Sequence, residues 1–383
     1  MLRITTVPIS LKLLLAGQFS FFQQHGFEVM TASADGEELK ELLSAGVTHH
    51  VVPMTRTITP VQDIICLLKL IRLIKIYKPD IVHTHTPKAG LLGMLAAWMC
   101  GVKIRMHTVA GLPLMEAKGK MRTLLKITER ITYSCATNVY PNSKGLLKYI
   151  REQLSIGNCQ LSILGKGSSN GIDSNYFSRT SKLVDAANGI RSRYQIPEGS
   201  FVFCFVGRVV KDKGIVELVE AFQKLGNGIE KRLILVGPRE DELDPLPDTT
   251  MISIKNDPTI ILPGFQHDVR PWMTASDVFV FPSYREGFPN VVMQAACLEV
   301  PCIVSNINGC NEIIENQVSG LVVEPKDSNA LLKAMQSMIV EKEKHKMFAI
   351  NAREFVSKNF DQQFVWQELL KEYRFHLNAK SNK

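Results

Sequence analysis

Short runs of apolar residues alternate along the chain with longer segments in which apolar residues recur every three or four positions. The short runs predict buried strands, and the longer segments, such as Val61–Ile76 and Met121–Tyr133, predict amphipathic helices. This alternation is typical of a parallel sheet with helices on both faces. The strands expected in the first half of the chain are Arg3–Val7, Phe27–Ala32, His50–Met54, Asp80–His85, Lys103–Thr108, Asn138–Pro141 and Gln160–Leu164.

The same alternation restarts after a segment rich in Gly, Ser and Asn, "GKGSSNGID", which has the composition of a linker. We therefore predict an N-terminal domain over residues 1–165, a linker over 166–173 and a second domain over 174–360. Both are expected to be α/β, doubly wound and Rossmann-like, and to face each other across a cleft. A last helix over 361–383 is expected to pack back on the N-terminal domain. The second domain's predicted strands are Phe201–Val206, Arg232–Val236, Ile260–Leu262, Val278–Pro282, Pro301–Ser305 and Gly320–Glu324.

Length and composition agree with this organisation. A chain of 383 residues is too long for one hydrophobic core, and 45% hydrophobic with 21% charged residues is typical of a soluble protein. The longest uncharged apolar run is too short to span a bilayer, and no secretory signal is evident, so we expect a cytoplasmic protein. None of the eight cysteines forms a CxxC pair, which favours buried free thiols over disulfides or zinc.

The formal net charge of +8 indicates an anionic partner or ordinary solubility charge. Nucleic acid is not expected, because the sequence has no nucleic-acid motif and no basic tail with interleaved aromatic residues. A phosphorylated small molecule and an anionic lipid surface remain the candidates.

The stretch "FVGRVVKDKG" lies between a predicted strand and a predicted helix. In parallel sheets, ligands bind at the carboxyl ends of the strands. Arg208 and Lys213 stand at such an end, beside a helix that is expected to begin at Gly214 with free backbone N–H groups. Fixed cations next to a helix N-terminus predict a phosphate site, and a solvated basic turn is the alternative.

The stretch "EGFPNVV" follows the next predicted strand end. A helix starting near Pro289 would leave the N–H groups of Asn290 and Val291 free to face an anion. Glu286, in the loop before it, would be repelled by a diphosphate unless it accepts hydrogen bonds from hydroxyl groups, which a sugar supplies. Gln294 lies one helical turn beyond Asn290 and could also meet ligand hydroxyls.

The stretch "HTHTPKAG" ends another predicted strand and places His83 and His85 on one face of it. No third metal ligand is evident, so we expect these histidines to line a cleft for an acceptor substrate rather than to bind a metal. Lys88 could meet a phosphate of that acceptor, or lie in solvent at the start of a helix.

Together these motifs resemble the retaining glycosyltransferases of family four, which have the two-Rossmann-domain GT-B fold. The family motif of a Glu, seven residues and a second Glu is matched by Glu286, "GFPNVVM" and Gln294. The stretches "VGRVVKDKG", "GFQHDVRPWMTASDVFVFPS" and "PCIVSNINGCNEIIENQVSGLVVEP" also fit the family. In the first half, "DIVHTHTPKAGLLGMLAA" and "HTVAGLP" resemble the branch that adds N-acetylhexosamine-type sugars to lipid-linked intermediates.

The resemblance implies a role for each matching residue. Arg208 and Lys213 would bind the donor diphosphate, Glu286 the donor-sugar hydroxyls and Gln294 the nucleotide ribose. Gly17 would face the donor phosphates, and His107 would lie near the donor sugar as a further catalytic residue. The remaining residues of the predicted donor site are Gly264, Phe265, Gly287, Phe288, Pro289, Asn290 and Val291, and the acceptor side is predicted at His85, Thr86, Lys88 and His107.

The predicted reaction moves N-acetylgalactosamine or another hexosamine from a UDP-sugar to a polyprenyl-diphosphate-linked glycan in bacterial capsule, O-antigen or protein-glycan assembly. Gln294 departs from the family motif, since an amide lacks the charge of a carboxylate. No Asp-x-Asp occurs in the sequence, so Arg208, Lys213 and helix N-termini must neutralise the leaving diphosphate, and neither a metal nor a cofactor is expected.

Two basic segments, Val61–Pro79 and Glu116–Arg122, are candidates for contact with an anionic membrane, which would make the protein peripheral on the inner face of the cell membrane. A sheet-covering helix with a solvated face is the alternative for the first segment. Two other functions share the predicted fold: a UDP-sugar 2-epimerase and a non-catalytic sugar-nucleotide-binding module.

Overall fold

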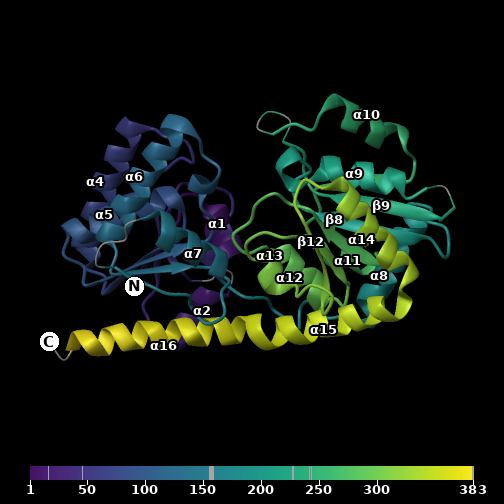
Figure 1. The fold of residues 1–383 in the computed structure, drawn as a ribbon. Coiled ribbons are helices and arrows are strands. Elements are labelled where there is room, and N and C mark those ends of the chain that lie inside the picture. The colour runs from purple at the N-terminus through teal and green to yellow at the C-terminus, as the bar shows by residue number, and fades with distance from the viewer. Residues whose placement is uncertain are drawn as a thin grey trace. The chain divides into compact units, whose positions relative to one another are not determined.

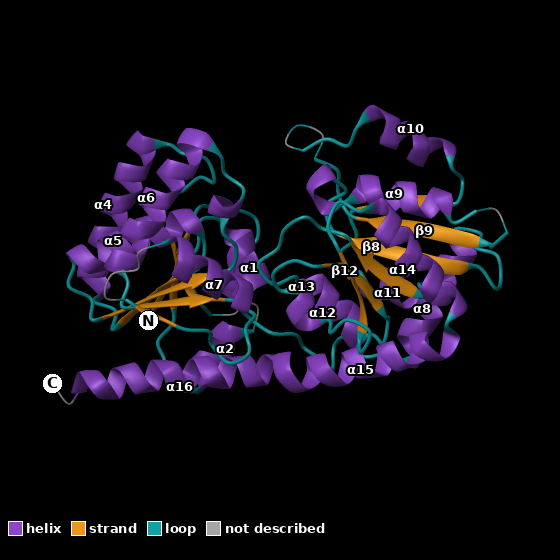
Figure 2. Ribbon diagram, in the orientation of Figure 1, coloured by secondary structure: helices purple, strands orange, loops and turns teal. Residues whose placement is uncertain are grey.

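The computed structural model describes residues 1–15, 17–44, 46–154, 159–226, 228–240, 242 and 244–381. It divides into two compact units. Unit 1 comprises Met1–Gly171 together with Gln362–Lys383, and unit 2 comprises Ile172–Asp361. Each unit has one parallel sheet covered by helices, as Figures 1 and 2 show.

Unit 1 is built on a seven-stranded sheet with the order β3-β2-β1-β4-β5-β6-β7. Every pairing is parallel. Buried parallel strands are nearly continuous apolar runs, which is why the sequence reveals them. The strands are β1 Leu2–Ile4, β2 Met30–Ser33, β3 Thr48–Val51, β4 Ile81–Thr84, β5 Ile104–Val109, β6 Asn138–Pro141 and β7 Gln160–Leu161.

Two hydrophobic clusters lie on the two faces of this sheet. One joins the sheet to α4 Pro60–Tyr77, α5 Pro87–Met99, α6 Gly119–Cys135 and α7 Lys144–Gln153. The other joins it to α1 Pro8–Leu15, α2 Gln18–Gln24, α3 Leu39–Ser44 and the C-terminal helix α16 Gln362–Ser381. Helix α16 contributes Val365, Trp366, Leu369, Leu370 and Tyr373 to that cluster, so the end of the chain is part of the core of unit 1.

Unit 2 has a six-stranded parallel sheet with the order β10-β9-β8-β11-β12-β13. Its strands are β8 Phe201–Val206, β9 Lys231–Val236, β10 Ile260–Gly264, β11 Val278–Phe281, β12 Cys302–Ser305 and β13 Gly320–Val323. Its helices are α8 Ser181–Arg193, α9 Ile215–Lys224, α10 Asp248–Asn256, α11 Arg270–Thr274, α12 Asn290–Cys297, α13 Cys310–Ile313, α14 Ser328–Val340 and α15 Lys342–Phe360.

In both sheets the strand order reverses at one point, between β1 and β4 in unit 1 and between β8 and β11 in unit 2. The carboxyl ends of the strands on either side of such a reversal border a crevice where α/β proteins bind ligands. His85 follows β4, Arg208 follows β8 and Glu286 follows β11, whereas Gly17 lies between α1 and α2. His85, Arg208 and Glu286 thus lie beside the reversal points of their sheets.

The predicted doubly wound α/β fold is confirmed, and each predicted strand overlaps an observed one. The differences are at strand ends: His50–Met54 becomes Thr48–Val51, and Arg3–Val7 becomes Leu2–Ile4. The eight cysteines are unpaired and buried or half-buried, as predicted. The predicted helix start at Gly214 is confirmed, because Gly214 is the N-cap of α9. The Gly214 N–H itself donates to the Lys211 carbonyl oxygen at 3.0 Å, at the end of a short 3-10 turn.

Candidate functional site

Arg208 follows the last residues of β8 at the reversal point of unit 2. Its backbone is placed by a close approach of two glycines, since a Cβ on Gly237 would lie 1.8 Å from the carbonyl oxygen of Gly207. The Arg208 guanidinium forms an ion pair with Glu240, and its Nη2 lies 3.9 Å from Asp212 Oδ2. The side chain is nevertheless 40% exposed, so the cation is oriented by carboxylates and still reaches solvent.

Lys213 and Glu286 form an ion pair that joins the β8 loop to the loop after β11. Ser283 adds a hydrogen bond from its Oγ to Glu286 Oε1 at 3.0 Å. The pair is 13% and 19% exposed, respectively, so both charges are largely shielded from water yet reachable. Gly214 makes this approach possible, because with φ at 72° a Cβ there would lie 2.1 Å from the carbonyl oxygen of Pro282.

Helix α12 begins directly after this loop, with Pro289 at its N-cap. Gly309 packs against the loop so closely that a Cβ would lie 2.6 Å from the carbonyl oxygen of Gly287 and 2.7 Å from Phe288 Cα. No side-chain cap occupies the N-terminus of α12, so the first amides of the helix, at Asn290 and Val291, are available to an anion.

Gln294 lies on α12 and is half-buried, while its neighbours Met293 and Ala295 are buried in the core. Within the described residues its amide has no hydrogen-bond partner. The loop after β10 adds an aromatic face: Gly264 has φ of 75°, and the side chain of Phe265 is 62% exposed with its ring edge-on to His267 at 5.0 Å. An exposed aromatic ring of this kind can stack on a nucleotide base.

The sequence did not reveal the carboxylates and hydroxyl that orient the two cations. Asp212 binds Arg285 at 3.0 Å as well as lying near Arg208, and Glu240 and Ser283 complete the set. Ser283 follows β11 directly and could have been found from that position. Glu240 could not, because 32 residues separate it from Arg208.

In unit 1, His107 lies on β5 and is buried. Its Nδ1 is 2.7 Å from Thr84 Oγ1. Gly90 of α5 packs directly on the ring, since a Cβ there would lie 2.5 Å from His107 Cε1. Burial lowers the pKa of His107 to about 4, so the ring is neutral at physiological pH and can accept or donate a hydrogen bond without carrying charge.

His85 and Thr86 lie where β4 ends and α5 begins. His85 is buried and accepts a hydrogen bond from Arg3 Nε at 3.0 Å. The Thr86 hydroxyl lies 2.7 Å from that of Thr6, and the Thr6 N–H donates to it at 2.9 Å. Both side chains are therefore fixed by the neighbouring strand β1, and a contact of either with an acceptor stays a prediction.

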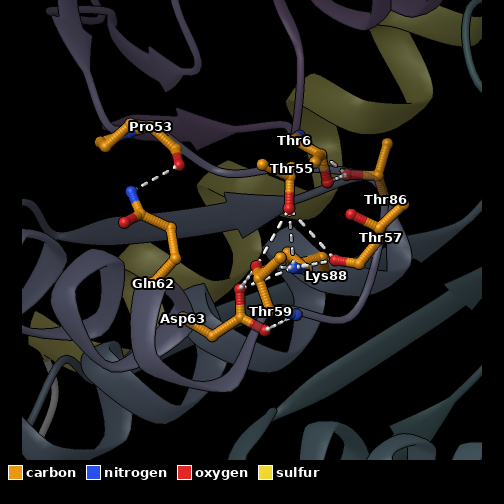
Figure 3. A network of polar contacts seen from close by, with 9 residues as sticks. All are labelled: Thr6, Pro53, Thr55, Thr57, Thr59, Gln62, Asp63, Thr86 and Lys88. Atoms are coloured by element: carbon orange, nitrogen blue, oxygen red, sulfur yellow. Dashed lines mark hydrogen bonds and ion pairs between the residues drawn. The ribbon is translucent and has the colours of Figure 1, made fainter.

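Lys88 is the centre of a polar network that ties the start of α5 to the loop before α4 (Figure 3). Its ammonium lies 2.6 Å from Asp63 Oδ1 and 3.1 Å from Thr59 Oγ1, and it also contacts Thr55 and the carbonyl oxygen of Thr57. Lys88 is thus neither a solvent lysine nor a free cation. An acceptor phosphate would have to compete with Asp63 for it.

Gly17 forms the turn that leads into α2, with φ of 78°. A Cβ there would lie 2.4 Å from Trp366 Cη2, so the indole of α16 closes one side of the turn. Gln18, the next residue, is fully buried. A ligand phosphate could therefore reach the backbone of this turn only from the side opposite Trp366.

Within the described residues, no group of three or more His, Cys, Asp or Glu side chains is arranged to hold a metal ion. No described helix combines the length and hydrophobicity needed to cross a bilayer.

Comparisons with known proteins agree with this geometry. The family model "Glycosyl transferases group 1" matches residues 186–355, and "Glycosyl transferase 4-like" matches residues 10–143. The capsular polysaccharide biosynthesis glycosyltransferase CapM of Staphylococcus aureus is 34% identical over 372 residues, 97% of this chain and 96% of CapM. A UDP-Gal:alpha-D-GlcNAc-diphosphoundecaprenol alpha-1,3-galactosyltransferase of Escherichia coli is 29% identical over 326 residues, 83% of this chain and 81% of the relative.

Among solved structures, a glycosyltransferase from Rickettsia africae superposes with a TM-score of 0.81 at 20% sequence identity, covering 98% of both chains. At this identity the likeness concerns the fold, and it confirms the predicted GT-B architecture.

Proposed function

We propose that this chain, which belongs to the family-four glycosyltransferases, acts in capsule or lipid-linked glycan assembly, as the names of its relatives suggest. In this proposal it transfers a hexosamine from a UDP-sugar to a polyprenyl-diphosphate-linked acceptor with retention of configuration. N-acetylgalactosamine or another hexosamine is the first candidate sugar. UDP-galactose, the donor in the name of the Escherichia coli relative, is the first competitor.

The observation that supports this proposal most is the Lys213–Glu286 ion pair beside the uncapped N-terminus of α12. The pair offers a cation for a donor phosphate and a carboxylate for sugar hydroxyls. The amides of Asn290 and Val291 add donors for the diphosphate. Gln294, one turn along the helix, would contact the ribose, and the exposed ring of Phe265 would contact the base.

The proposed reaction takes place on one face of the sugar. The bond between C1 and the diphosphate oxygen breaks, the acceptor hydroxyl oxygen bonds to C1 from the same side, and the hydroxyl proton moves to the departing diphosphate. Arg208 and Lys213 would stabilise the negative charge that develops on the leaving group. His107, neutral and fixed by Thr84, would hydrogen-bond the donor sugar, and the backbone of the Gly17 turn would contact the phosphates.

We also propose that the reaction needs no divalent metal. The sequence has no Asp-x-Asp, and the carboxylates nearest the proposed diphosphate site, Asp212, Glu240 and Glu286, are each engaged by an Arg or Lys. Activity in the presence of excess chelator tests this directly. Loss of activity that is restored by Mg²⁺ or Mn²⁺ would contradict it.

The acceptor's polyprenyl chain lies in a membrane, so we propose that unit 1 binds the anionic inner face of the cell membrane. Helix α5 packs between α4 and α6, and both flanking helices present exposed apolar residues at helical spacing. On α4 these are Val61, Ile64, Ile65 and Leu68, and on α6 they are Met121, Leu124, Ile127 and Ile131. Residues 60–78 and 116–135 carry nine Lys or Arg against three Asp or Glu, which favours an anionic surface.

Two other functions remain as competitors. A UDP-sugar 2-epimerase would turn over a UDP-sugar without any acceptor. A non-catalytic binding module would bind UDP-sugars without releasing UDP in any acceptor screen. The amide of Gln294, in place of the second Glu of the family motif, is the feature that favours this function.

A panel of UDP-sugars in a thermal-shift assay, followed by UDP release with a polyprenyl-diphosphate acceptor, tests the proposal. A donor present at 100 times its dissociation constant adds about 2.7 kcal/mol to the free energy of unfolding. Stabilisation by UDP-hexosamines together with acceptor-dependent UDP release would support a transferase. Stabilisation by none of the UDP-sugars would contradict the proposed donor class.

A further inference from the structure

Arg3 is a fully buried cation in the central strand β1 of unit 1. No carboxylate within the described part of the chain forms an ion pair with it. Instead its Nε donates to His85 Nε2 at 3.0 Å and its Nη2 donates to Gln18 Oε1 at 2.9 Å. Burying an arginine without a counterion is costly, so this arrangement needs a reason beyond packing.

The contact with Arg3 determines which nitrogen of His85 carries the proton. A guanidinium only donates hydrogen bonds, so His85 Nε2 must be the unprotonated nitrogen of a neutral ring and Nδ1 must carry the hydrogen. Burial, together with the nearby His83 and Arg3, lowers the pKa of His85 well below its ordinary value, which keeps the ring neutral. His85 therefore offers one N–H, at Nδ1.

That N–H is unsatisfied in the structure. His85 Nδ1 is buried and has no hydrogen-bond partner among the described residues, whereas the Arg3 guanidinium also lies beside the Tyr373 hydroxyl. A buried donor without an acceptor is rare in folded proteins. An oxygen atom of a ligand would satisfy His85 Nδ1.

The Nη2 group of Arg3 connects it to the Gly17 turn through Gln18. Gln18 accepts from Arg3 and donates through its amide nitrogen to the Ser169 carbonyl oxygen at 3.0 Å and to Asn170 Oδ1 at 2.8 Å. The Trp366 indole N–H donates to the same Asn170 oxygen at 2.8 Å. Arg3 thus connects His85, after β4, to the turn between α1 and α2.

We propose that Arg3 is a positioning residue: it holds His85 as an Nδ1–H donor for a substrate oxygen and, through Gln18, keeps the Gly17 turn in register with that donor. The hydrogen bond from His85 to a substrate rests on the proposed transferase function. The protonation of His85 at Nδ1 does not depend on that function, so the tautomer and the substrate contact can be tested separately.

The first test is ¹⁵N NMR of the whole protein labelled at histidine, with the His85 signals identified by their loss in His85→Gln. The wild-type protein should show His85 protonated at Nδ1 with a bare Nε2 near neutral pH. In Arg3→Met the His85 signals should shift towards a mixture of tautomers. Protonation of Nε2 in the wild-type protein, or an unchanged tautomer in Arg3→Met, would overturn the proposal.

The second test is kinetic and uses the geometry of the histidine ring. In His85→Asn, the side-chain amide nitrogen lies close to the position of Nδ1 and can donate in its place. In His85→Gln, the longer side chain places the amide near the position of Nε2 instead. His85→Asn should therefore retain more activity than His85→Gln, by about 10-fold in kcat/KM. Arg3→Met should lose about as much as His85→Gln. Equal activity of the two His85 variants would overturn the assigned donor.

Matched variants separate this role from stability. Arg3→Lys can donate to His85 or to Gln18 but cannot reproduce the fork of a guanidinium, so it should lie between wild type and Arg3→Met. Ile4→Val, on the same strand, should lower the melting temperature and leave the His85 signals and kcat/KM unchanged. If Arg3→Met does not fold, the wild-type tautomer and the Arg3→Lys kinetics still decide. If the tautomer is as proposed but the wild-type protein shows no acceptor-dependent UDP release, the proposed function fails and the positioning of His85 by Arg3 remains.

Discussion

Glu286 and Gln294 carry the central residue-scale prediction, because they occupy the two positions of the family motif and differ in their surroundings. Glu286 is held by Lys213 and Ser283, whereas Gln294 has no hydrogen-bond partner among the described residues. Glu286→Gln should lower kcat about 10²–10³-fold, since one charge-assisted hydrogen bond in a shielded site is lost. Steady-state kinetics with varied donor measures this.

Gln294 provides the matched comparison. It would touch a part of the donor that does not react, so Gln294→Ala should raise the donor KM with little change in kcat. Gln294→Glu should keep activity and tighten UDP binding, because it restores the carboxylate of the family motif. Wild-type turnover in Glu286→Gln, or a loss of kcat in Gln294→Ala at unchanged donor KM, would show that the two roles are assigned wrongly.

Gly90 gives a residue-scale test of His107. Replacing a helical Gly by Ala ordinarily stabilises a protein by about 0.5–1 kcal/mol, but a methyl group at Gly90 would lie 2.5 Å from the His107 ring. Gly90→Ala should therefore lower both the melting temperature and kcat as the ring is displaced from Thr84. Gly189→Ala on α8 is the control, because nothing lies within 4 Å of a Cβ there, and it should be neutral or stabilising. If Gly90→Ala and Gly189→Ala had the same melting temperature and the same kcat, the proposed role of the His107 position in catalysis would be wrong.

At the scale of elements, α4 and α6 carry the membrane prediction. Lys69, Arg72 and Lys75 are exposed on α4. Replacing all three by Glu should abolish sedimentation with vesicles containing anionic lipid, because each basic residue near such a surface contributes about 1 kcal/mol. The same charge change at Lys224, Lys255 and Lys346 of unit 2 is the control. Equal binding of both triple variants, or binding of the wild-type protein to neutral vesicles alone, would contradict a role for α4.

The strands were predictable from sequence and much of the site was not, for a physical reason. A buried parallel strand such as Phe201–Val206 is a continuous apolar run, so its signal is local. The partners of site residues are not local: Arg3 and His85 are 82 residues apart, and His83 and Tyr373 are 290 apart. Only folding brings them together. Glycines and cations after strands could be found, whereas the groups that orient them could not.

At the scale of the whole molecule, the two units should differ in their response to acid. In unit 1, burial lowers the pKa values of His49 and His107 to about 4, those of His83 and His85 well below their ordinary value, and that of His50 as well. Burial also raises the pKa of Glu129 to about 7. The histidines of unit 2, His267 and His345, lie apart from such a cluster.

The signs of these effects oppose each other. Below pH 6.5 the unfolded chain protonates its histidines while the buried rings of the folded unit stay neutral, so the stability that these neutral rings supply above that pH is lost as the pH falls. Glu129 acts the other way, because its folded form holds a proton that the unfolded form releases above about pH 4.5. Near pH 5.5 these rings outweigh the single carboxyl, so the unfolded chain binds more protons than the folded one and unit 1 loses stability as the pH falls.

Tryptophan fluorescence during urea unfolding can separate the units, since Trp98 and Trp366 lie in unit 1 and Trp272 lies in unit 2. The variant Trp272→Phe reports on unit 1, and the double variant Trp98→Phe and Trp366→Phe reports on unit 2. Between pH 7.5 and 5.5 the urea midpoint of unit 1 should fall much further than that of unit 2. His83→Gln removes one titrating ring and keeps groups that can bond Tyr373 and Thr108, so it should reduce the slope for unit 1 by about 1.2 kcal/mol per pH unit. Equal slopes for the two units would mean that the buried histidines of unit 1 gain protons without unfolding.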